Sequence, residues 1–303
     1  MIYTIASLYY EEELSQSDVA QRLGISSATV SRHLRAAREQ GIVRISVHKP
    51  ATDGQLAGDL REMLGLRRVE LAEDTRSRSS SAHLAAPLAR VLEQIGLSPG
   101  SIVAVGWGQT AWDISQVKLP PLPDVTFVPA SGGIPWAEEP FQTTEIVRRM
   151  ALSAGAHLQM MHAPYLPSIA LRRSLASDPE VSRVAFSWDH LSAAIVGVGM
   201  PYRLQQASEH LSGRVAPEES DLADAAGDVL LHYLDDQGVH LPWPREDQLL
   251  SVTLEQLRAT RDVIGVACGA EKARGVVAAA RGGAISTLVT DRSTARDVLA
   301  LLK

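Results

Sequence analysis

The stretch Gln16–Arg35, which reads QSDVAQRLGISSATVSRHLR, most constrains what this chain can fold into. Its small and apolar residues have the spacing of a helix-turn-helix. Ala20 is small where two helices would cross, and Gly24 stands four residues later, where the turn needs a left-handed backbone. Val30 follows after six more residues and would face the first helix of the pair. The spacing predicts a DNA-binding module at the start of the chain.

The flanks of this motif agree with the same interpretation. Ser15 and Ser26 stand where N-caps would accept hydrogen bonds from free amides, so we expect helices over 15–23 and 27–40. An apolar stripe predicts an earlier helix over 2–13, and Gly41 would end the third helix. Apolar and polar residues then alternate over 43–48, which predicts a short, half-exposed strand of the kind that forms a wing.

The charge of the chain is unevenly distributed. The formal net charge is −6, which argues against a protein that binds nucleic acid along its whole surface. Residues 21–50, however, hold six basic residues against the single acidic Glu39, a balance of +5. A small basic head on an acidic body is typical of a DNA-binding module joined to a domain of another kind.

The N-terminal end of the third helix would enter the major groove of duplex DNA. Val30 and Leu34 would point inward, with Ile25. The residues expected to contact DNA are Ser27, Ala28, Thr29, Ser31, Arg32 and Arg35. Among them, Arg32 can make a bidentate contact to a guanine edge, worth roughly 1–3 kcal/mol of discrimination. The alternative is a helical pair with no role in DNA binding.

We expect three segments: a helix-turn-helix domain over 1–48, a linker over 49–56 and an effector domain over 57–303. The linker is polar and contains Pro and Gly. Beyond it, short apolar runs end in Gly or Pro turns and are followed by helical stretches. This order predicts an α/β domain with a mainly parallel sheet covered on both faces. The expected strands are 102–105, 125–128, 157–161, 194–198, 263–267 and 285–289.

Glycine-rich loops follow several of these strands, and ligands collect at the carboxyl ends of parallel strands. Gly106 and Gly108 would let the backbone approach an anion, and Thr110 offers a hydroxyl and an amide at a helix start. A tight strand-to-helix turn explains the same residues equally well. The sequence Ser131–Gly133 (SGG) forms a second loop of this type.

Two charged residues stand out in the second half of the chain. Asp228 precedes the apolar stretch 229–238, read as a helix or a turn, and is either an N-cap or an acceptor for ligand hydroxyls. Lys272 lies at an expected helix start, where a cation opposes the helix dipole, so a bound anion would account for it. The alternative is a solvated surface lysine.

The sequence offers little for catalysis. It has no GxSxG elbow, no HExxH motif and no Cys–His pair in sequence, and its histidines lack the spacing of metal ligands. We therefore expect no enzymatic activity, no metal and no cofactor. The single cysteine, Cys268, rules out an intramolecular disulfide and suits a reducing compartment. With no apolar run long enough to span a bilayer and no signal peptide pattern, we expect a cytoplasmic protein.

The chain resembles the SorC-type transcriptional regulators of bacterial carbohydrate metabolism over nearly its whole length. The head, LYYEEELSQSDVAQRLGISSATVSRHLRAAREQGIV, is similar to the head of that family. The segments VGWGQT, VPASGGI, MHAPYLP, AIVGVG, AAGDVLLHYLDDQGV, GVACGAEKARGVVAAARGG and TLVTD occur in the family's order. Three residues depart from its pattern: Gln109 where Arg is frequent, Ser131 where an apolar residue stands, and Cys268 where Gly is common.

The resemblance implies an effector domain similar to the folds of glucosamine-6-phosphate deaminase and ribose-5-phosphate isomerase, which binds a sugar phosphate or related polyol without turning it over. By motif, Gly106, Gly108, Thr110 and Lys272 would hold the phosphate, while Gln142 and Asp228 would contact hydroxyls. The resemblance also implies a tetramer, a dimer of dimers on operator DNA. The alternative is a sugar-phosphate isomerase or deaminase that carries a DNA-binding head.

Overall fold

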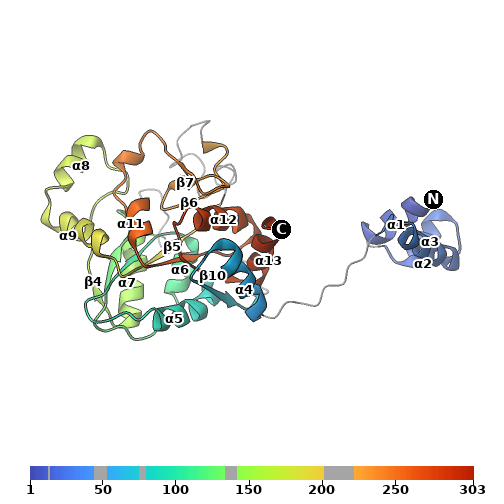
Figure 1. The fold of residues 1–303 in the computed structure, drawn as a ribbon, viewed down its shortest axis with the longest axis horizontal. Helices are drawn as coiled ribbons and strands as arrows, with labels where there is room; N and C mark the ends of the chain where they lie inside the picture. The colour runs from blue at the N-terminus through green and yellow to red at the C-terminus, as the bar shows by residue number, and fades with distance from the viewer. Residues whose placement is uncertain (13, 44–52, 75–79, 134–141, 201–221) are drawn as a thin grey trace. The chain divides into compact units, whose positions relative to one another are not determined.

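The structure is a computed structural model that describes residues 1–12, 14–43, 53–74, 80–133, 142–200 and 222–303 (Figure 1). The chain divides into two compact units, Met1–Pro50 and Ala51–Lys303. Each unit has a hydrophobic core of its own.

The small unit contains the helices α1 (Ile2–Tyr10), α2 (Gln16–Leu23) and α3 (Ser27–Glu39). Ser15 caps α2: its side chain accepts a hydrogen bond from the amide of Asp18, whose own side chain accepts one from the amide of Ser15. Gly24 adopts a left-handed conformation with φ +66°, as the helix-turn-helix spacing predicts. The core of this unit consists of Ile5, Ala6, Leu8, Val19, Ala20, Val30, Leu34 and Ala37.

The predicted wing lies mostly outside the described residues. Val43 is described and packs against the core of the small unit. Gly41 follows α3 with φ +71°, which agrees with its predicted place after the third helix. The first helix is shorter than predicted, because α1 ends at Tyr10.

A seven-stranded parallel sheet forms the centre of the larger unit, with the strand order β1-β10-β9-β5-β2-β3-β4. The chain adds strands toward one edge from β2 to β4 and toward the other edge from β5 to β10. The direction therefore reverses between the neighbours β2 and β5. The strands are β1 (Arg68–Ala72), β2 (Ile102–Val105), β3 (Thr126–Pro129), β4 (His157–Leu158), β5 (Ala193–Gly197), β9 (Asp262–Val266) and β10 (Thr287–Asp291).

Helices cover both faces of this sheet, as predicted, because the strands are apolar on both sides. Along β2, Val103 and Val105 enter one core while Ala104 enters the other. One face is covered by η1 (Ala82–Leu84), α5 (Ala85–Gln94), α6 (Gln109–Ser115) and α7 (Thr143–Ala154). The other is covered by α4 (Asp53–Leu64), α9 (Pro179–Ser187), η2 (Trp188–His190), α11 (Leu254–Ala259), α12 (Ala273–Arg281) and α13 (Arg292–Leu301).

Helix α4 corrects the predicted linker. The linker was expected over 49–56, but α4 begins at Asp53 and its Leu56 is buried in the core of the larger unit. Asp53 also accepts a hydrogen bond from the guanidinium of Arg292 in α13. The C-terminal part of the predicted linker therefore belongs to the larger unit, since the polar sequence before Leu56 forms the exposed first turn of a helix.

A three-stranded antiparallel sheet, β6 (Gly227–Val229), β7 (His232–Leu234) and β8 (His240–Leu241), corrects a second prediction. The stretch 229–238 contains a hairpin, so the helical alternative is wrong and the turn is right. This sheet packs on a third core with Tyr165, Leu222, Ala225, Tyr233, Trp243 and Leu249. The short helices α8 (Ile169–Leu175), η4 (Glu246–Gln248) and η5 (Ala270–Lys272) complete the described elements.

Glycines allow the hairpin, α12 and the loop after β5 to meet at backbone distance. A Cβ atom on Gly275 would lie 2.1 Å from the carbonyl oxygen of Gly199, and one on Gly227 would lie 2.5 Å from the Cα of Gly275. Backbone atoms cannot move aside as side chains can. Gly227 and Gly275 are therefore required by packing.

We predict that Gly275→Ala destabilises the larger unit by about 1–3 kcal/mol, the usual penalty for forcing extra atoms into a packed core. The matched control is Gly58→Ala in α4, where a Cβ atom would meet nothing within 4 Å. Because alanine favours helix more than glycine does, the control should gain about 0.5–1 kcal/mol. Urea unfolding curves of both variants test this, and equal stability of the two would contradict it.

Candidate functional site

The predicted recognition helix, α3, is held in place from its N-terminus. The side chain of Ser26 accepts a hydrogen bond from the amide of Thr29 at 3.1 Å, and the two hydroxyl oxygens lie 2.8 Å apart. Val30 and Leu34 are buried, as predicted, and fix the rotation of the helix against α1 and α2. The opposite face of α3 is thereby directed to solvent.

The residues predicted to contact DNA lie on that solvent face. Thr29 is partly buried beside its cap, and the others are exposed: Ser27, Ala28, Ser31, Arg32 and Arg35. Elsewhere in the small unit, Arg22 forms an ion pair with Glu12 at 2.7 Å. Arg44 and Lys49, which contribute to the predicted basic charge, lie outside the described residues.

The second candidate site lies at the carboxyl ends of the parallel strands, where the chain direction reverses between β2 and β5. In open parallel sheets, ligands bind in the crevice at this switch point. The loop after β2 carries Gly106 and Gly108, Thr110 lies in the first turn of α6, and the loop after β5 carries Gly199. Asp228 joins this region because its carbonyl accepts a hydrogen bond from the amide of Gly199 at 2.8 Å.

The two predicted glycines of the β2 loop differ in role. The amide of Gly106 already donates to the carbonyl of Ile195 at 2.8 Å, so it is engaged within the sheet. A Cβ atom at this position would lie 3.2 Å from the side chain of Leu230, which makes Gly106 a packing residue. Gly108 has φ +116° and open space around it, and it precedes α6, in which Thr110 is the second residue.

The SGG loop after β3 is also a packing feature. The amides of Gly132 and Gly133 donate to the carbonyls of Leu250 and Ala163. A Cβ atom on Gly132 would lie 2.6 Å from the carbonyl oxygen of Ala163. Gln142 stands at the start of α7 without capping it through its side chain, and its Oε1 lies near Gly133. A hydroxyl-binding role for Gln142 stays a prediction.

Asp228 is buried and does not cap a helix. Its Oδ2 accepts a hydrogen bond from the amide of Leu231 at 2.9 Å, across the turn of the hairpin. Leu230 and Leu231 both have positive φ, at 53° and 59°, which is rare for leucine and costs free energy locally. Tyr165 and Trp243 also stabilise the turn, because their side chains donate to the carbonyls of Leu230 and Leu231.

Lys272 ends η5 and immediately precedes α12, where its charge opposes the helix dipole. It is partly buried. Burial lowers the pKa of Lys272 below its usual value, while the negative charges of Asp228 and Glu271 act in the opposite direction. The structure thus brings the two charged residues that the sequence singled out into one electrostatic environment, in which the charge of Asp228 acts on Lys272.

Two groups of titratable side chains escaped the sequence analysis. One consists of His83, Cys268 and Asp291, and the other of His232, His240 and Glu246. In the first group the residues come from distant parts of the chain, so no spacing could have revealed it. In the second, His232 and His240 are eight positions apart and lie on two neighbouring strands of one sheet. A helical interpretation of this stretch does not bring the two side chains together.

Comparison with known proteins supports both halves of this arrangement. The family described as "Putative sugar-binding domain" matches residues 48–300, and the family described as "Winged helix-turn-helix DNA-binding" matches residues 5–44. The sorbitol operon regulator of Klebsiella pneumoniae is 30% identical over 317 residues, which cover 99% of this chain and 97% of that protein. The deoxyribonucleoside regulator of Bacillus subtilis is 28% identical over 297 residues, which cover 96% of this chain and 94% of that protein.

A solved structure agrees with these sequence matches. The full-length sorbitol operon regulator from Klebsiella pneumoniae superimposes with a TM-score of 0.73 at 27% identity, covering 100% of this chain and 98% of that chain.

Within the described ranges, no helix has the length and hydrophobicity needed to cross a bilayer.

We predict that Asp228→Asn lowers the pKa of Lys272 further, because the carboxylate charge is one of the influences that raise it. Asparagine keeps an oxygen that can accept from the amide of Leu231, so the turn should persist. Labelled lysine followed by NMR across a pH series measures this directly, since the chain holds few lysines and Lys118 serves as an internal reference. An unchanged or raised pKa of Lys272 would show that Asp228 does not act on it.

Proposed function

Because the chain belongs to the SorC family of sugar-binding transcriptional regulators, we propose that its small unit reads an operator and its larger unit binds a small, phosphorylated carbohydrate that controls it. The observation that carries this proposal is the pairing of an exposed recognition face on α3 with a buried carboxylate and a lysine near the switch point of the sheet. We place the protein in the cytoplasm, where it meets its operator.

On DNA, the N-terminal part of α3 enters the major groove. Arg32 makes a bidentate contact to a guanine edge, while Ser27, Ser31 and Thr29 contact phosphates or base edges near the start of the helix. Ala28 is small enough to let the helix approach the bases, and Arg35 contacts the backbone one turn later. The exposure of this face supports these roles.

In the larger unit, the ammonium of Lys272 binds the phosphate, together with the backbone of Gly108 and the hydroxyl of Thr110. Asp228 accepts hydrogen bonds from the sugar hydroxyls, and Gln142 contacts another part of the same ligand. Gly106 acts by packing, since its amide is engaged by Ile195. The effector controls DNA binding by favouring one of two states, which requires a difference in binding free energy of about 1–3 kcal/mol.

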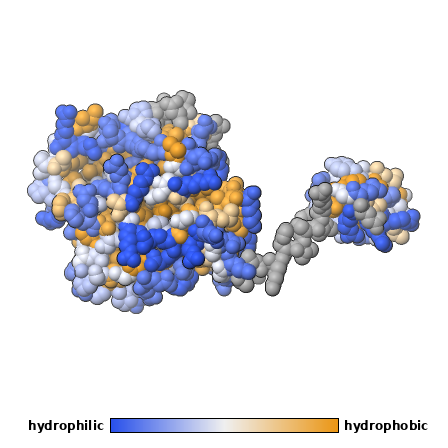
Figure 2. Space-filling model, in the orientation of Figure 1, coloured by the Kyte–Doolittle hydropathy of each residue, from blue (hydrophilic) through white to orange (hydrophobic). Residues whose placement is uncertain are grey.

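We further propose that the protein assembles with copies of itself, as a tetramer built from two dimers. In α8, all of which is described, no residue is buried, and Ile169 and Leu171 are 55% and 42% exposed. Hydrophobic residues also lie at the surface around α8 in Figure 2. Large apolar side chains that remain exposed on a short helix are what a contact between copies would cover, which supports a partner surface here.

The assembly predicts that the double variant Ile169→Asp, Leu171→Asp has a smaller mass in solution than the unmodified protein. Charged side chains would have to be buried in the contact between copies. Size-exclusion chromatography with light scattering measures the mass, and far-ultraviolet circular dichroism checks that the fold is retained. An unchanged mass would exclude this helix from the contact.

A sugar-phosphate isomerase or deaminase with a DNA-binding head is the competing function. The relatives described above are named as regulators, which favours a binding role. Incubation of the protein with aldose and amino-sugar phosphates, followed by NMR, tests for turnover. Conversion of any of them would establish the enzymatic alternative.

We predict that Arg32→Ala removes specific operator binding and leaves effector binding unchanged, whereas Lys272→Ala weakens effector binding and leaves operator binding unchanged. Loss of the bidentate contact should cost about 1–3 kcal/mol of discrimination. Operator binding is measured by fluorescence anisotropy. Effector binding is measured by thermal stability against sugars, polyols and their phosphates, where ligand at 100 times its Kd adds about 2.7 kcal/mol of stability.

Matched controls accompany both variants. Lys118→Ala removes an exposed lysine of the larger unit, and Arg61→Ala removes an exposed arginine of α4, a helix to which no binding role is assigned. Both controls should behave as the unmodified protein. If Arg32→Ala and Lys272→Ala each lost both activities while remaining folded, the assignment of one activity to each unit would be wrong. Stabilisation by unphosphorylated sugars alone would remove the phosphate from the proposal.

A further inference from the structure

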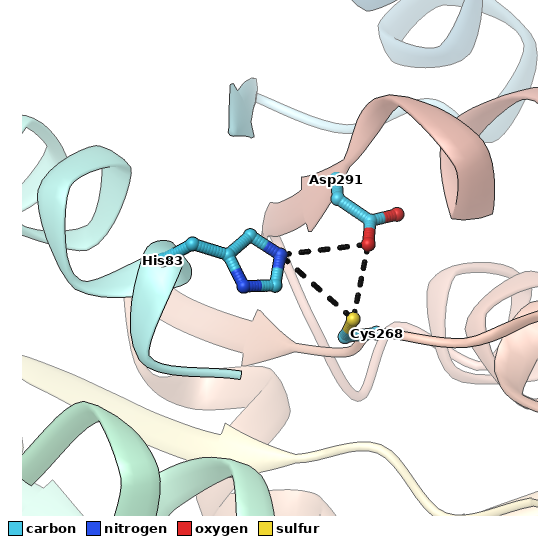
Figure 3. A group of neighbouring side chains, drawn as sticks. All are labelled: His83, Cys268 and Asp291. Atoms are coloured by element: carbon cyan, nitrogen blue, oxygen red, sulfur yellow. Dashed lines mark hydrogen bonds and ion pairs between the residues drawn. The ribbon is translucent and has the colours of Figure 1, made fainter. Parts of the chain in front are cut away.

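His83, Cys268 and Asp291 converge from three segments of the chain that are distant in sequence (Figure 3). His83 lies in η1, Cys268 follows the end of β9, and Asp291 is the last residue of β10. The imidazole, the thiol and the carboxylate point toward one another. The side chains of His83 and Asp291 are only 13% and 7% exposed, so the group is largely sheltered from water.

The distances between the three polar atoms are close to those of a ligand set. Cys268 Sγ lies 3.9 Å from His83 Nε2 and 3.0 Å from Asp291 Oδ2, and these two atoms are 3.5 Å apart. A tetrahedral zinc ion, with bonds of about 2.3 Å to sulfur and 2.0–2.1 Å to nitrogen or oxygen, spaces its ligand atoms by roughly 3.3–3.6 Å. Shifts of roughly half an ångström would therefore bring all three atoms to bonding distance.

The carboxylate is positioned for this role by α13. Its Oδ1 accepts hydrogen bonds from the amide of Thr294 at 2.8 Å and the hydroxyl of Ser293 at 3.0 Å. That leaves Oδ2 directed at the thiol and the imidazole. The ring of His83 makes its polar contacts through Nε2, while its buried Nδ1 has no hydrogen-bond partner among the described residues. The polar contacts that orient this ring are therefore those with Cys268 and Asp291.

Without an ion, the thiol keeps its proton. Burial, together with the hydrogen bond to Asp291 and its negative charge, raises the pKa of Cys268 to about 12. A divalent ion would replace that proton: the S–H bond breaks, the proton leaves to water, and the sulfur lone pair forms the bond to the metal. Thiolate and carboxylate would then carry two negative charges, which match a doubly charged ion.

We propose that His83 Nε2, Cys268 Sγ and Asp291 Oδ2 form a binding site for a divalent ion of the zinc type. Sulfur and imidazole nitrogen favour zinc and related transition metals over magnesium and calcium, which prefer oxygen ligands. Three protein ligands leave the fourth position of a tetrahedral ion to water or to an oxygen atom of a small molecule. This proposal departs from the expectation, drawn from the sequence, that the chain binds no metal.

The second titratable group does not share this geometry. Oε1 of Glu246 lies 2.6 Å from His232 Nδ1 and 2.7 Å from His240 Nε2, which are hydrogen-bond distances shorter than the spacing of metal ligands. His232 Nε2 also lies 3.0 Å from the carbonyl oxygen of Val252. We interpret this group as a hydrogen-bond network, and it provides an internal control for the test.

Cobalt(II) is the probe, because a thiolate bound to it gives a charge-transfer band in the near ultraviolet. Cys268 is the only cysteine of the chain, so such a band on the full-length protein reports on this residue alone. We expect one cobalt ion per chain with a thiolate band, and displacement of that band by zinc. Cys268→Ser should abolish the band and weaken zinc binding, measured by calorimetry, by at least about tenfold.

Two further variants make the outcome decisive. His83→Gln should weaken zinc binding as Cys268→Ser does, whereas His240→Gln should leave the band and the affinity unchanged. Serine retains a hydroxyl that can donate to Asp291, so Cys268→Ser should fold, and its melting temperature without metal is the check. Absence of a thiolate band, or equal zinc binding by the unmodified protein and Cys268→Ser, would overturn the proposal. Loss of binding in His240→Gln would place the ion at the other group and overturn it as well.

Discussion

The contact among Gly199, Gly227 and Gly275 determines where the chemistry of the larger unit lies. A side chain on Gly227 or on Gly275 would collide with main-chain atoms, which have no freedom to move aside. The contact brings β6 and the start of α12 against the loop after β5, next to the switch point of the sheet. Asp228 follows Gly227 directly and Lys272 ends the turn before α12, so their proximity is a consequence of backbone packing.

The hairpin that carries Asp228 is stable because tertiary contacts offset a local penalty. Two consecutive leucines in left-handed conformation are unfavourable in an isolated turn, where Asn or Gly would be preferred. Here both leucines are buried, and Asp228, Tyr165 and Trp243 satisfy the polar backbone atoms of the turn. Such strain persists only where the surroundings determine the conformation. The carboxylate of Asp228 is therefore held rigidly, with its charge near Lys272.

A structural element could be predicted from the sequence where the residues that determine its conformation lie within or next to it in the chain. Caps at Ser15 and Ser26 and the glycine at Gly24 act within a few residues, so the helix-turn-helix was predicted almost to its boundaries. Buried strands followed by glycine turns likewise gave the parallel sheet. The hairpin after Gly227 was not separable from a helix, because its turn depends on residues more than ten positions away. The packing contacts of Gly106 and Gly132 could not be predicted for the same reason, since their neighbours come from distant segments of the chain.

The loop after β9 links the two proposed sites of the larger unit. It carries Cys268 at one end and Lys272 at the other, and Gly269 between them has φ +114°, a conformation that favours glycine. The amide of Gly269 donates to the hydroxyl of Thr294 in α13, the helix that Asp291 caps. An ion held by Cys268 and an anion held by Lys272 would thus act on the same short segment. Binding of one can influence the other only if this segment has a different preferred conformation in each state, because coupling requires a difference in affinity between states.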